Sequence, residues 1–257
     1  MENEFWGDYH THTFYSDAVL APLELTIRKG IKLGFKQIAI TDHSYSNFSK
    51  SLSPKKVIRQ HKKIDILQKK YPQIKILKGI EANILDEKGS FDLSREECKK
   101  FDVINLGFHR YLKYRNRNTL DFQLYNGFYS LLYPNKINTE KRKQINTDSY
   151  IEIIKKYPIS TLAHINNCTK VNPLKLALAC EKYGTYLEIN RMHFRFLEPF
   201  LDEIVTKTNC MFIVNSDAHS FFTVGGFSKA RKFIESGRLP TNRIANYKKL
   251  PEFRSTK

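Results

Sequence analysis

The chain has 257 residues, with 43 Lys and Arg against 26 Asp and Glu, a net charge of +17, and 41% apolar residues. This apolar content excludes wholesale disorder, and no apolar run approaches the roughly 20 residues of a membrane span. The N-terminus lacks the basic-then-apolar pattern of a signal peptide. The four cysteines, at 98, 168, 180 and 210, form no C-x-x-C pair, which argues against a zinc ribbon and suits a reducing compartment. We therefore expect a soluble, cytoplasmic, globular protein without a membrane partner.

The positive charge is unevenly distributed. Residues 50–78, 110–145 and 228–257 carry net charges of +9, +6 and +7, so the remainder of the chain is net negative. A basic exterior around an acidic site would attract anionic substrates or nucleic acid. Solvated helix faces explain the same lysines equally well, and the sequence leaves both interpretations open.

Short apolar or β-branched runs alternate with amphipathic stretches along the whole chain. The runs predict strands over 6–11, 36–41, 74–81, 102–108, 160–164, 185–190 and 211–216. The amphipathic stretches predict helices over 22–33, 54–71, 94–100, 147–157, 173–183, 197–208 and 227–236. Ser53-Pro54 is typical of a helix start, and Gly34 and Gly184 are placed to end helices.

Seven strand–helix repeats predict a single α/β domain over residues 1–257, whose parallel sheet closes into a barrel. An open doubly wound sheet is the alternative, but no G-x-G-x-x-G follows the first strand, and the chain contains no Walker P-loop. Residues 110–145 are too long for a strand–helix connection of about 2–6 residues. We interpret them as a basic insertion with seven aromatic residues, leaving the C-terminal end of the fourth strand.

Side chains that can bind metals cluster at predicted strand ends. Six of the eight histidines lie within two residues of such an end: His10, His12, His43, His109, His164 and His219. Asp17, Glu81 and Asp217 lie in the same regions. In parallel barrels, active sites are built at the C-terminal rim, and imidazoles with carboxylates suit Zn, Fe or Mn. The pattern therefore predicts a metal site at this rim.

Three other residues are interpreted differently. His61 lies in a lysine-rich helix and is expected on a solvated face, while His193 stays undecided. Asp42 is expected to accept a hydrogen bond that orients a histidine.

Eight short motifs together resemble one known family. They are Asp8-Tyr9-His10-Thr11-His12, Ser16-Asp17, Thr41-Asp42-His43, Gly79-Ile80-Glu81-Ala82-Asn83, Gly107-Phe108-His109, Ala163-His164, Glu188-Ile189-Asn190 and Asn215-Ser216-Asp217-Ala218-His219. Their order and wording are similar to the PHP (polymerase and histidinol phosphatase) superfamily, and most similar to its stand-alone trinuclear-metal phosphatases.

The resemblance implies a distorted (β/α)7 TIM-like barrel with three divalent ions, Zn, Mn or Fe, at its C-terminal rim. It implies that His10, His12, Glu81 and Asp217 hold one ion. Glu81 would bridge to a second ion held by His109 and His164, and Asp17, His43 and His219 would hold the third. Glu81, Asp217 and His219 are the expected catalytic residues.

The implied activity is hydrolysis of a small phosphomonoester by a metal-bridging hydroxide. Arg110 and Arg191 are placed to bind phosphate, although either could be a surface arginine. One alternative is a nuclease or nucleotide phosphoesterase, because the insertion could bind a nucleic-acid backbone and stack bases. Histidinol-phosphate phosphatase is another, and a non-catalytic metal-stabilised binding module is the third.

We expect the insertion to form a lid whose Lys113, Arg115 and Arg117 attract anions. The alternative is that its aromatic residues pack on the barrel or on a second subunit.

Overall fold

The protein was analysed as a computed structural model, which describes residues 4–48, 51–113, 116–129, 132–133 and 139–254. Its seven strands are β1 (Gly7–Asp8), β2 (Gln37–Ile40), β3 (Lys75–Asn83), β4 (Val103–Gly107), β5 (Thr161–Leu162), β6 (Tyr186–Asn190) and β7 (Phe212–Asn215). They form one sheet in sequence order, and every neighbouring pair is parallel. This order confirms the predicted barrel and rules out the doubly wound alternative, in which the strand order would reverse.

The barrel closes between its first and last strands through sparse contacts. Thr11 and Ala218 form an isolated parallel bridge, and the His12 amide donates to the Ala218 carbonyl over 2.9 Å. The Ser216 amide donates to a carboxylate oxygen of Asp8 over 3.1 Å. The regular ladder of β1 is therefore shorter than the predicted 6–11, because the chain beyond Asp8 reaches β7 through this isolated bridge and through side chains.

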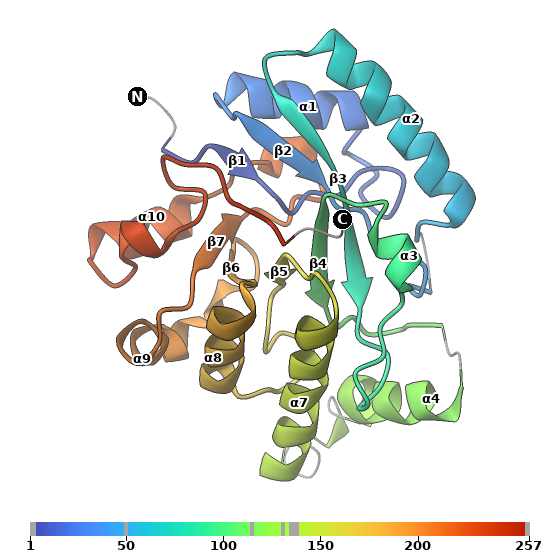
Figure 1. Ribbon diagram of the computed structural model, residues 1–257, viewed down its shortest axis with the longest axis vertical. Helices are drawn as coiled ribbons and strands as arrows, with labels where there is room; N and C mark the ends of the chain where they lie inside the picture. Colours follow the sequence, from blue (N-terminus) through green and yellow to red (C-terminus); the bar gives the residue numbers. More distant parts are fainter. Residues whose placement is uncertain (1–3, 49–50, 114–115, 130–131, 134–138, 255–257) are drawn as a thin grey trace.

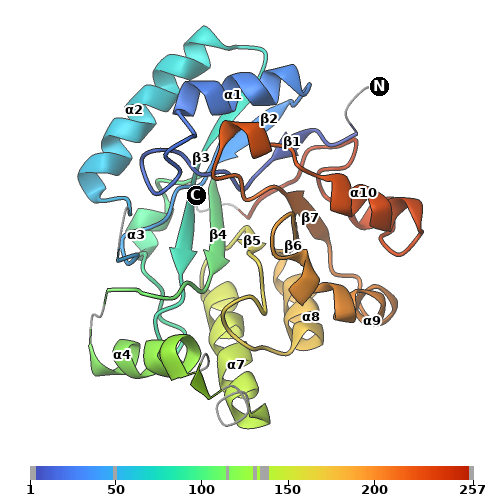
Figure 2. The same ribbon diagram turned by 180° about the vertical axis from the view of Figure 1, so that it is seen from behind.

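Helices cover the outside of the sheet in both views (Figures 1 and 2). They are α1 (Leu23–Lys32), α2 (Pro54–Lys70), α3 (Arg95–Cys98), α4 (Arg117–Gln123), the π-helical η1 (Leu124–Tyr129), α7 (Glu140–Lys156), α8 (Pro173–Tyr183), α9 (Leu201–Lys207) and α10 (Ser228–Glu235). Four single 3-10 turns lie at Phe194–Phe196, Glu198–Phe200, Phe221–Thr223 and Thr241–Arg243. No helix in the described ranges is long and apolar enough to cross a membrane.

The predicted helix ends are confirmed by their capping contacts. The Ser53 hydroxyl accepts from the Lys56 amide at the start of α2, where Pro54 is the first helical residue. Gly34 follows α1 with a φ of +77°, and Gly184 ends α8 with a φ of +67°. Residues with a Cβ rarely adopt these left-handed conformations, so glycine favours the stop at both points.

The barrel interior is filled by a small apolar cluster below the rim. Ala39, Leu77, Val103 and Ile213 meet there around Tyr9. The ring of Phe253 lies 5.2 Å from that of Tyr9 in a T-shaped arrangement, so the C-terminal segment packs against the same cluster. Successive strand residues alternate between this interior and the helix-covered face. The next inward-facing residues, toward the C-terminal end of each strand, therefore meet at the C-terminal rim of the barrel.

The segment predicted as an insertion contains α4 and η1, and α7 begins inside it at Glu140. Helix α7 thus starts earlier than the predicted 147, because Thr139 caps it by accepting from the Arg142 amide. Phe122 is buried and packs edge-on against Phe108, with ring centroids 5.7 Å apart. The other aromatic side chains described in this segment are largely exposed: Tyr111, Tyr125, Phe128, Tyr129 and Tyr133. Tyr114 and Arg115 lie outside the described residues.

Candidate metal centre

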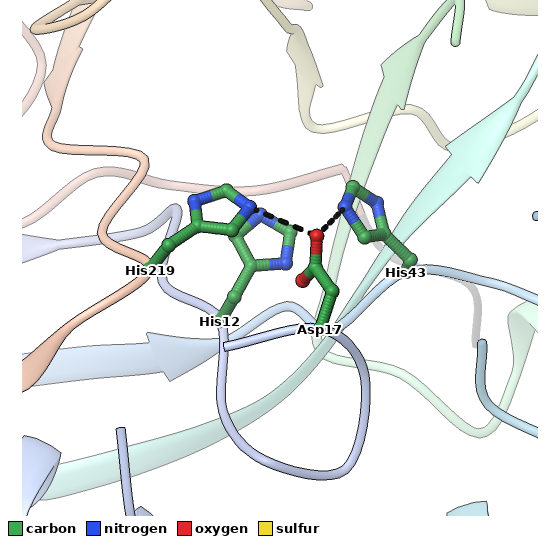
Figure 3. Close-up of side chains that lie close together, drawn as sticks. All are labelled: His12, Asp17, His43 and His219. Atoms are coloured by element: carbon green, nitrogen blue, oxygen red, sulfur yellow. Dashed lines mark ion pairs between the residues drawn. The ribbon is translucent and has the colours of Figure 1, made fainter. Parts of the chain in front are cut away.

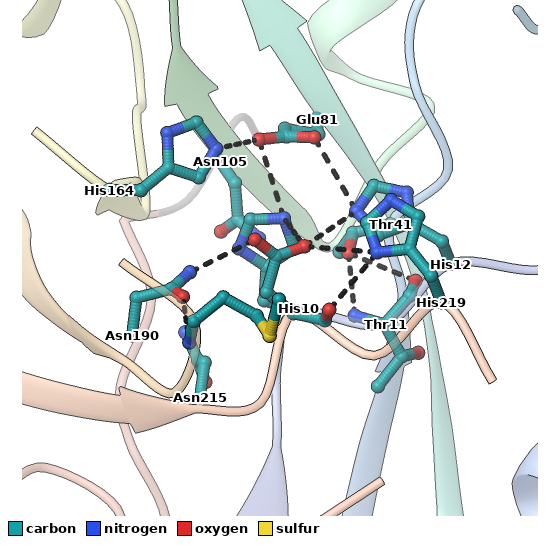
Figure 4. Close-up of polar contacts among 12 residues, drawn as sticks. His10, Thr11, His12, Thr41, Glu81, Asn105, His164, Asn190, Asn215 and His219 are labelled. Atoms are coloured by element: carbon teal, nitrogen blue, oxygen red, sulfur yellow. Dashed lines mark hydrogen bonds and ion pairs between the residues drawn. The ribbon is translucent and has the colours of Figure 1, made fainter. Parts of the chain in front are cut away.

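Glu81 is the residue on which the polar cluster at the rim converges. Leu77 lies in the barrel interior, and strand alternation turns Glu81 to the same side four residues later, fully buried. Its Oε1 lies 2.7 Å from Nε2 of His164 and 3.3 Å from Nε2 of His10 and of His109. Its Oε2 lies 2.8 Å from Nδ1 of His43 and 3.5 Å from Nε2 of His12. One carboxylate therefore lies close to five imidazoles, of which those of His10, His12 and His164 are labelled in Figure 4.

Two aspartates complete the cluster. Figure 3 shows the Asp17 carboxylate between two imidazoles, and its Oδ2 lies 3.4 Å from Nε2 of both His43 and His219. Asp217 has a left-handed φ of +52°, and its Oδ1 lies 3.2 Å from Nε2 of His12. The rings of His12 and His219 stack with centroids 4.3 Å apart. Since His219 contacts Asp17 and His12 contacts Asp217, this stacked pair lies between the two aspartates.

All nine predicted metal ligands fall within four overlapping groups that could each hold an ion. The groups are His12, Asp17, His43 and His219; His10, Glu81 and His164; His10, His12 and Asp217; and His43, Glu81 and His109. Within each group, the potential ligand atoms lie within 4.8 Å of one another. Glu81, His10, His12 and His43 each belong to two groups, and of these four only Glu81 has two oxygens with which to bridge two ions. Which ligand serves which ion stays a prediction.

The hydrogen bonding of the cluster fits a metal centre. Nε2 of His10, both ring nitrogens of His12, Nδ1 of His43 and Oε2 of Glu81 are buried, and none makes a well-directed hydrogen bond to a described residue, even though the last two atoms lie 2.8 Å apart. Buried polar atoms are normally satisfied, so this many unpaired ligand atoms in one place require compensation. Imidazole and carboxylate are the ligands of Zn and of related first-row divalent ions. The residues therefore suit divalent cations.

The electrostatics also favour cations. Burial alone would raise the pKa of Glu81, but His109, His10 and His43 hold it well below its ordinary value. Burial is likewise outweighed at Asp217, where His10 and His12 keep the pKa well below the ordinary range. Burial and the neighbouring His219 and His43 lower the pKa of His12 to about 3. Although burial opposes it, the carboxylates raise the pKa of His10 well above its ordinary value and that of His43 to about 10, so protons on these imidazoles balance the negative charge in the metal-free site. Bound cations would take the place of those protons.

Sequence reasoning gave no site role to the residues that orient the histidines. Nδ1 of His10 lies 2.7 Å from Oε1 of Glu188, and the backbone amide of His164 donates to Oε2 of Glu188 over 2.8 Å. The Asn190 amide donates to both Glu188 and Asp217. Nδ1 of His109 lies 2.7 Å from Oδ1 of Asn83. The second ring nitrogens of His10 and His109 are thereby left to face Glu81.

Asp42 acts differently from the prediction. Its carboxylate accepts from the Thr13 amide and hydroxyl, from the Ser16 hydroxyl and from the Gln60 amide, and no histidine bonds to it. The expectation that it orients a histidine is therefore wrong. Asp42 instead fixes the loop that carries Asp17.

The two remaining histidines are now placed. His193 belongs to the rim, since its ring lies 5.5 Å from that of His164 and its Nε2 lies 3.9 Å from Oδ2 of Asp217. His61 is not on a solvated face, because its Nε2 is buried and its ring packs edge-on against Phe101 at 5.4 Å. The expectation for His61 is wrong because His61 lies at the edge of the buried face of α2, between Gln60 and Ile64, whereas the lysines at 62 and 63 are exposed.

The two predicted phosphate-binding arginines lie in different surroundings. Arg110 lines a cavity of about 410 Å³ together with Asp17 and His43, and its buried Nε has no hydrogen-bond partner among the described residues. Arg191 donates from Nε to the Ser216 carbonyl over 3.2 Å. A Cβ added at Gly226 would lie 2.3 Å from Cδ of Arg191, so this glycine is what permits the arginine to pack there. A phosphate-binding role stays a prediction for both.

Comparison with known proteins places these observations in a family. A probable phosphatase of Thermoanaerobacter sp. (strain X514) is 27% identical over 93% of this chain and 89% of its own length. A DNA polymerase/3′-5′ exonuclease of Bacillus subtilis is 24% identical over 96% of this chain, which corresponds to 40% of that protein. The fold is shared with the crystal structure of histidinol phosphate phosphatase from Lactococcus lactis, complexed with zinc, L-histidinol and phosphate. That match has a TM-score of 0.60 at 17% identity and covers 98% of this chain and 97% of the other.

The family model described as PHP domain matches residues 8–192. This range contains seven of the nine candidate ligands, and the other two, Asp217 and His219, lie within hydrogen-bonding or ion-pair distance of them in the structure. The chain therefore belongs to the PHP domain family.

Proposed function

We propose that this protein is a metal-dependent phosphoesterase that hydrolyses a small phosphomonoester. The observation that carries the proposal is the cluster of nine ligand-type side chains at the rim, beside a cavity of about 410 Å³ that Asp17, His43 and Arg110 line. The name of the Thermoanaerobacter relative, which aligns over most of both chains, supports the same class of reaction.

We further propose three divalent ions, Zn, Mn or Fe, with the ligand sets given above and with Glu81 shared between two of them. Such ions lower the pKa of bound water and neutralise the charge of phosphoryl oxygens. The chain supplies the fixed geometry. Glu81 and Asp217 provide buried negative charge, while the His219 side chain is 45% exposed and so lies at the mouth of the site.

Arg110 is the residue we propose to bind the phosphoryl group. Its Nε has no hydrogen-bond partner in the part of the chain that the structure describes, and Arg110 shares a cavity with two candidate metal ligands. A guanidinium can donate two parallel hydrogen bonds to phosphate, which fixes the orientation of the group as well as its charge. Arg191 already donates to a carbonyl, so we propose that it mainly supports the segment that carries Asp217.

Phosphate esters of nucleic acids are the second candidate substrates. The Bacillus relative is named as a polymerase and exonuclease, and several aromatic rings of the segment after β4 are exposed beside basic residues. Exposed aromatic rings and cations are the features that bind single strands. Histidinol phosphate is the third candidate, because the Lactococcus enzyme of the same fold is named for it. We also propose a cytoplasmic location for the present protein, because its four cysteines are all free.

The test is hydrolysis by protein reconstituted separately with Zn, Mn and Fe, with metal content measured in parallel. The substrates are alkyl phosphomonoesters, histidinol phosphate and a single-stranded oligonucleotide. We expect phosphate release from a monoester, its loss in Asp217→Asn, and wild-type rates in the matched control Glu235→Gln, an exposed residue of α10. Arg110→Lys should raise KM because the bidentate contact is lost. Absence of hydrolysis with two or more bound equivalents of each metal would refute the proposal.

A further inference from the structure

The lining of the cavity beside the candidate metal centre combines two kinds of residue. Asp17, His43, Asn47 and Arg110 are charged or polar, and Phe48, Tyr111 and Leu112 are aromatic or aliphatic. Asp17 and His43 are candidate metal ligands, so the charged residues suit the phosphoryl group. Phe48 and Tyr111, which we call the aromatic wall, carry no charge and are available for the organic part of a substrate.

The backbone holds the two aromatic residues of this wall together. Asn47 and Leu112 form an antiparallel bridge between the segment after β2 and the segment after β4. The Phe48 amide donates to the Tyr111 carbonyl over 3.0 Å, and the Lys113 amide donates to the Ser46 carbonyl over 2.7 Å. The two rings therefore belong to a hydrogen-bonded pair of segments, and substrate binding need not order a free loop to bring them together.

Both rings are unusually accessible. The Phe48 and Tyr111 side chains are each 75% exposed. Tyr111 also has a φ of +65°, a left-handed conformation that is rare for a bulky residue and concentrated at functional sites. Large aromatic surfaces left in water beside a polar cluster are available to bind a flat apolar group.

A second cavity of about 280 Å³ lies beside the first. It shares Arg110, Tyr111 and Leu112 with the first cavity, and Leu124 and Phe128 of η1 also line it. Arg110 and Tyr111 therefore line both cavities. The first cavity alone, at about 410 Å³, has room for an organic group larger than a short alkyl chain.

We infer that the wall formed by Phe48 and Tyr111 binds the alcohol part of the substrate, and that the substrate is a phosphomonoester whose alcohol carries a flat apolar ring. This inference rests on the proposed phosphomonoesterase activity. The phosphoryl group lies toward Asp17, His43 and Arg110, and the ring lies against Phe48 and Tyr111. Phe48 and Tyr111 are then specificity-determining residues without a part in the chemistry.

The experiment measures binding, so that it does not depend on turnover. Metal-reconstituted protein is titrated calorimetrically with 2-phenylethylphosphonate, 2-cyclohexylethylphosphonate and propylphosphonate, which share one anionic group and differ in the flat ring. We expect the phenyl compound to bind about tenfold more tightly than the propyl compound, the ratio that about 1.4 kcal/mol of aromatic contact gives. It should also bind more tightly than the cyclohexyl compound, whose ring is puckered.

The double variant Phe48→Ala/Tyr111→Ala should reduce the phenyl-to-propyl affinity ratio to about two, since the aromatic contacts are lost. Phe48→Leu, which keeps apolar volume in case the double variant does not fold, should reduce it in the same direction. Phe222→Ala is the matched control, because this ring is 70% exposed and is not part of the cavity lining; its ratio should equal that of the wild type.

Equal affinities of the wild type for the three phosphonates, or a ratio unchanged in both wall variants, would overturn the inference. Hydrolysis of the matching phosphates, 2-phenylethyl phosphate and propyl phosphate, is measured separately. These two esters release primary alcohols, so the leaving groups differ little in reactivity. Failure of the proposed function would appear as no hydrolysis of either ester, and failure of the inference as equal binding of the phosphonates.

Discussion

Nδ1 of His10 lies 2.7 Å from Oε1 of Glu188, and both side chains are fully buried. The carboxylate also accepts from the backbone amide of His164 and from the amides of Asn190 and Asn215. Its four donors come from β6, β7 and the residues that follow β1 and β5. Burial alone would raise the pKa of Glu188, but His10 and His164 hold it below its ordinary value. Glu188 therefore fixes the ring of His10 and stays ionised.

Replacing Glu188 by Gln should weaken metal binding without contacting the ions directly. The side-chain NH2 of Gln is itself a donor and would face at least one of the four donors that now point at the carboxylate. The hydrogen bond that orients the His10 ring would then be weakened or lost. Loss of such an orienting partner typically lowers metal affinity about 10- to 100-fold. Competition with a chelator measures the affinity, and Glu235→Gln is the control. Unchanged affinity would show that His10 is oriented by other contacts.

Gly107 lies close to the metal centre at the end of β4. A Cβ at this position would lie 2.9 Å from Cε1 of His164 and 3.3 Å from Oε1 of Glu81. Gly107→Ala should therefore displace the His164 ring and lower the bound metal by one equivalent or more. Elemental analysis gives the metal content. Gly127→Ala is the matched control, because its Cβ would meet only Cγ of Arg110 at 3.9 Å. Equal metal content in both variants would mean that the ring tolerates the methyl group.

Glu81 and Asp17 should differ in their effect on activity. The Glu81 carboxylate lies near five histidines, whereas Asp17 contacts His43 and His219 and has a 34% exposed side chain. Glu81→Gln should remove at least two equivalents of metal and nearly all activity. Asp17→Ala should remove about one and leave measurable turnover. Metal content and kcat/KM are determined together on both variants, and equal losses would contradict the shared role of Glu81.

His61 should make the protein sensitive to acid. Burial, with a contribution from Lys78, lowers its pKa to about 4, against 6.5 for an unperturbed histidine. As pH falls from 6.5 to about 4, the unfolded chain takes up a proton that the folded chain excludes, so the free energy of unfolding decreases. Above pH 6.5 the histidine is neutral in both states and has no such effect.

His61→Gln should remove this part of the pH dependence. Urea unfolding of the variant and the wild type at pH 7, 5.5 and 4.5 gives the difference in free energy of unfolding at each pH. Titrations of the metal-site residues occur in both proteins and cancel in that difference. Lys62→Gln, an exposed neighbour on α2, is the control. A difference that does not change with pH would show that the pKa of His61 is the same in the folded and the unfolded protein.

Residue patterns predicted the fold and the rim well, because both depend on local signals. The alternation of strands and helices, and helix ends such as Ser53 and Gly184, are determined by residues that are neighbours in the sequence. The convergence of the candidate ligands followed from one geometric rule, that parallel strands end at a common edge. The ladder of β1 was overestimated because pairing beyond Asp8 is decided by β7, more than 200 residues away.

The supporting contacts could not be predicted in the same way. Glu188 and Asn83 have no pattern of their own that marks them as partners of His10 and His109. Their roles depend on side chains 178 and 26 residues distant. Asp42 was assigned to the wrong partner for the same reason, since its position after β2 did not reveal that Thr13 and Ser16 would fold back over it.

The bridge between Thr11 and Ala218 has a consequence for folding. His10 and His12 flank one of its residues, and Asp217 and His219 flank the other. The pairing that completes the barrel thus joins segments about 200 residues apart, which makes it entropically expensive and slow to form. Cations bound by these four residues would cross-link the two segments in the folded state alone. Metal availability during biosynthesis would then determine how much of the newly made chain reaches its closed form.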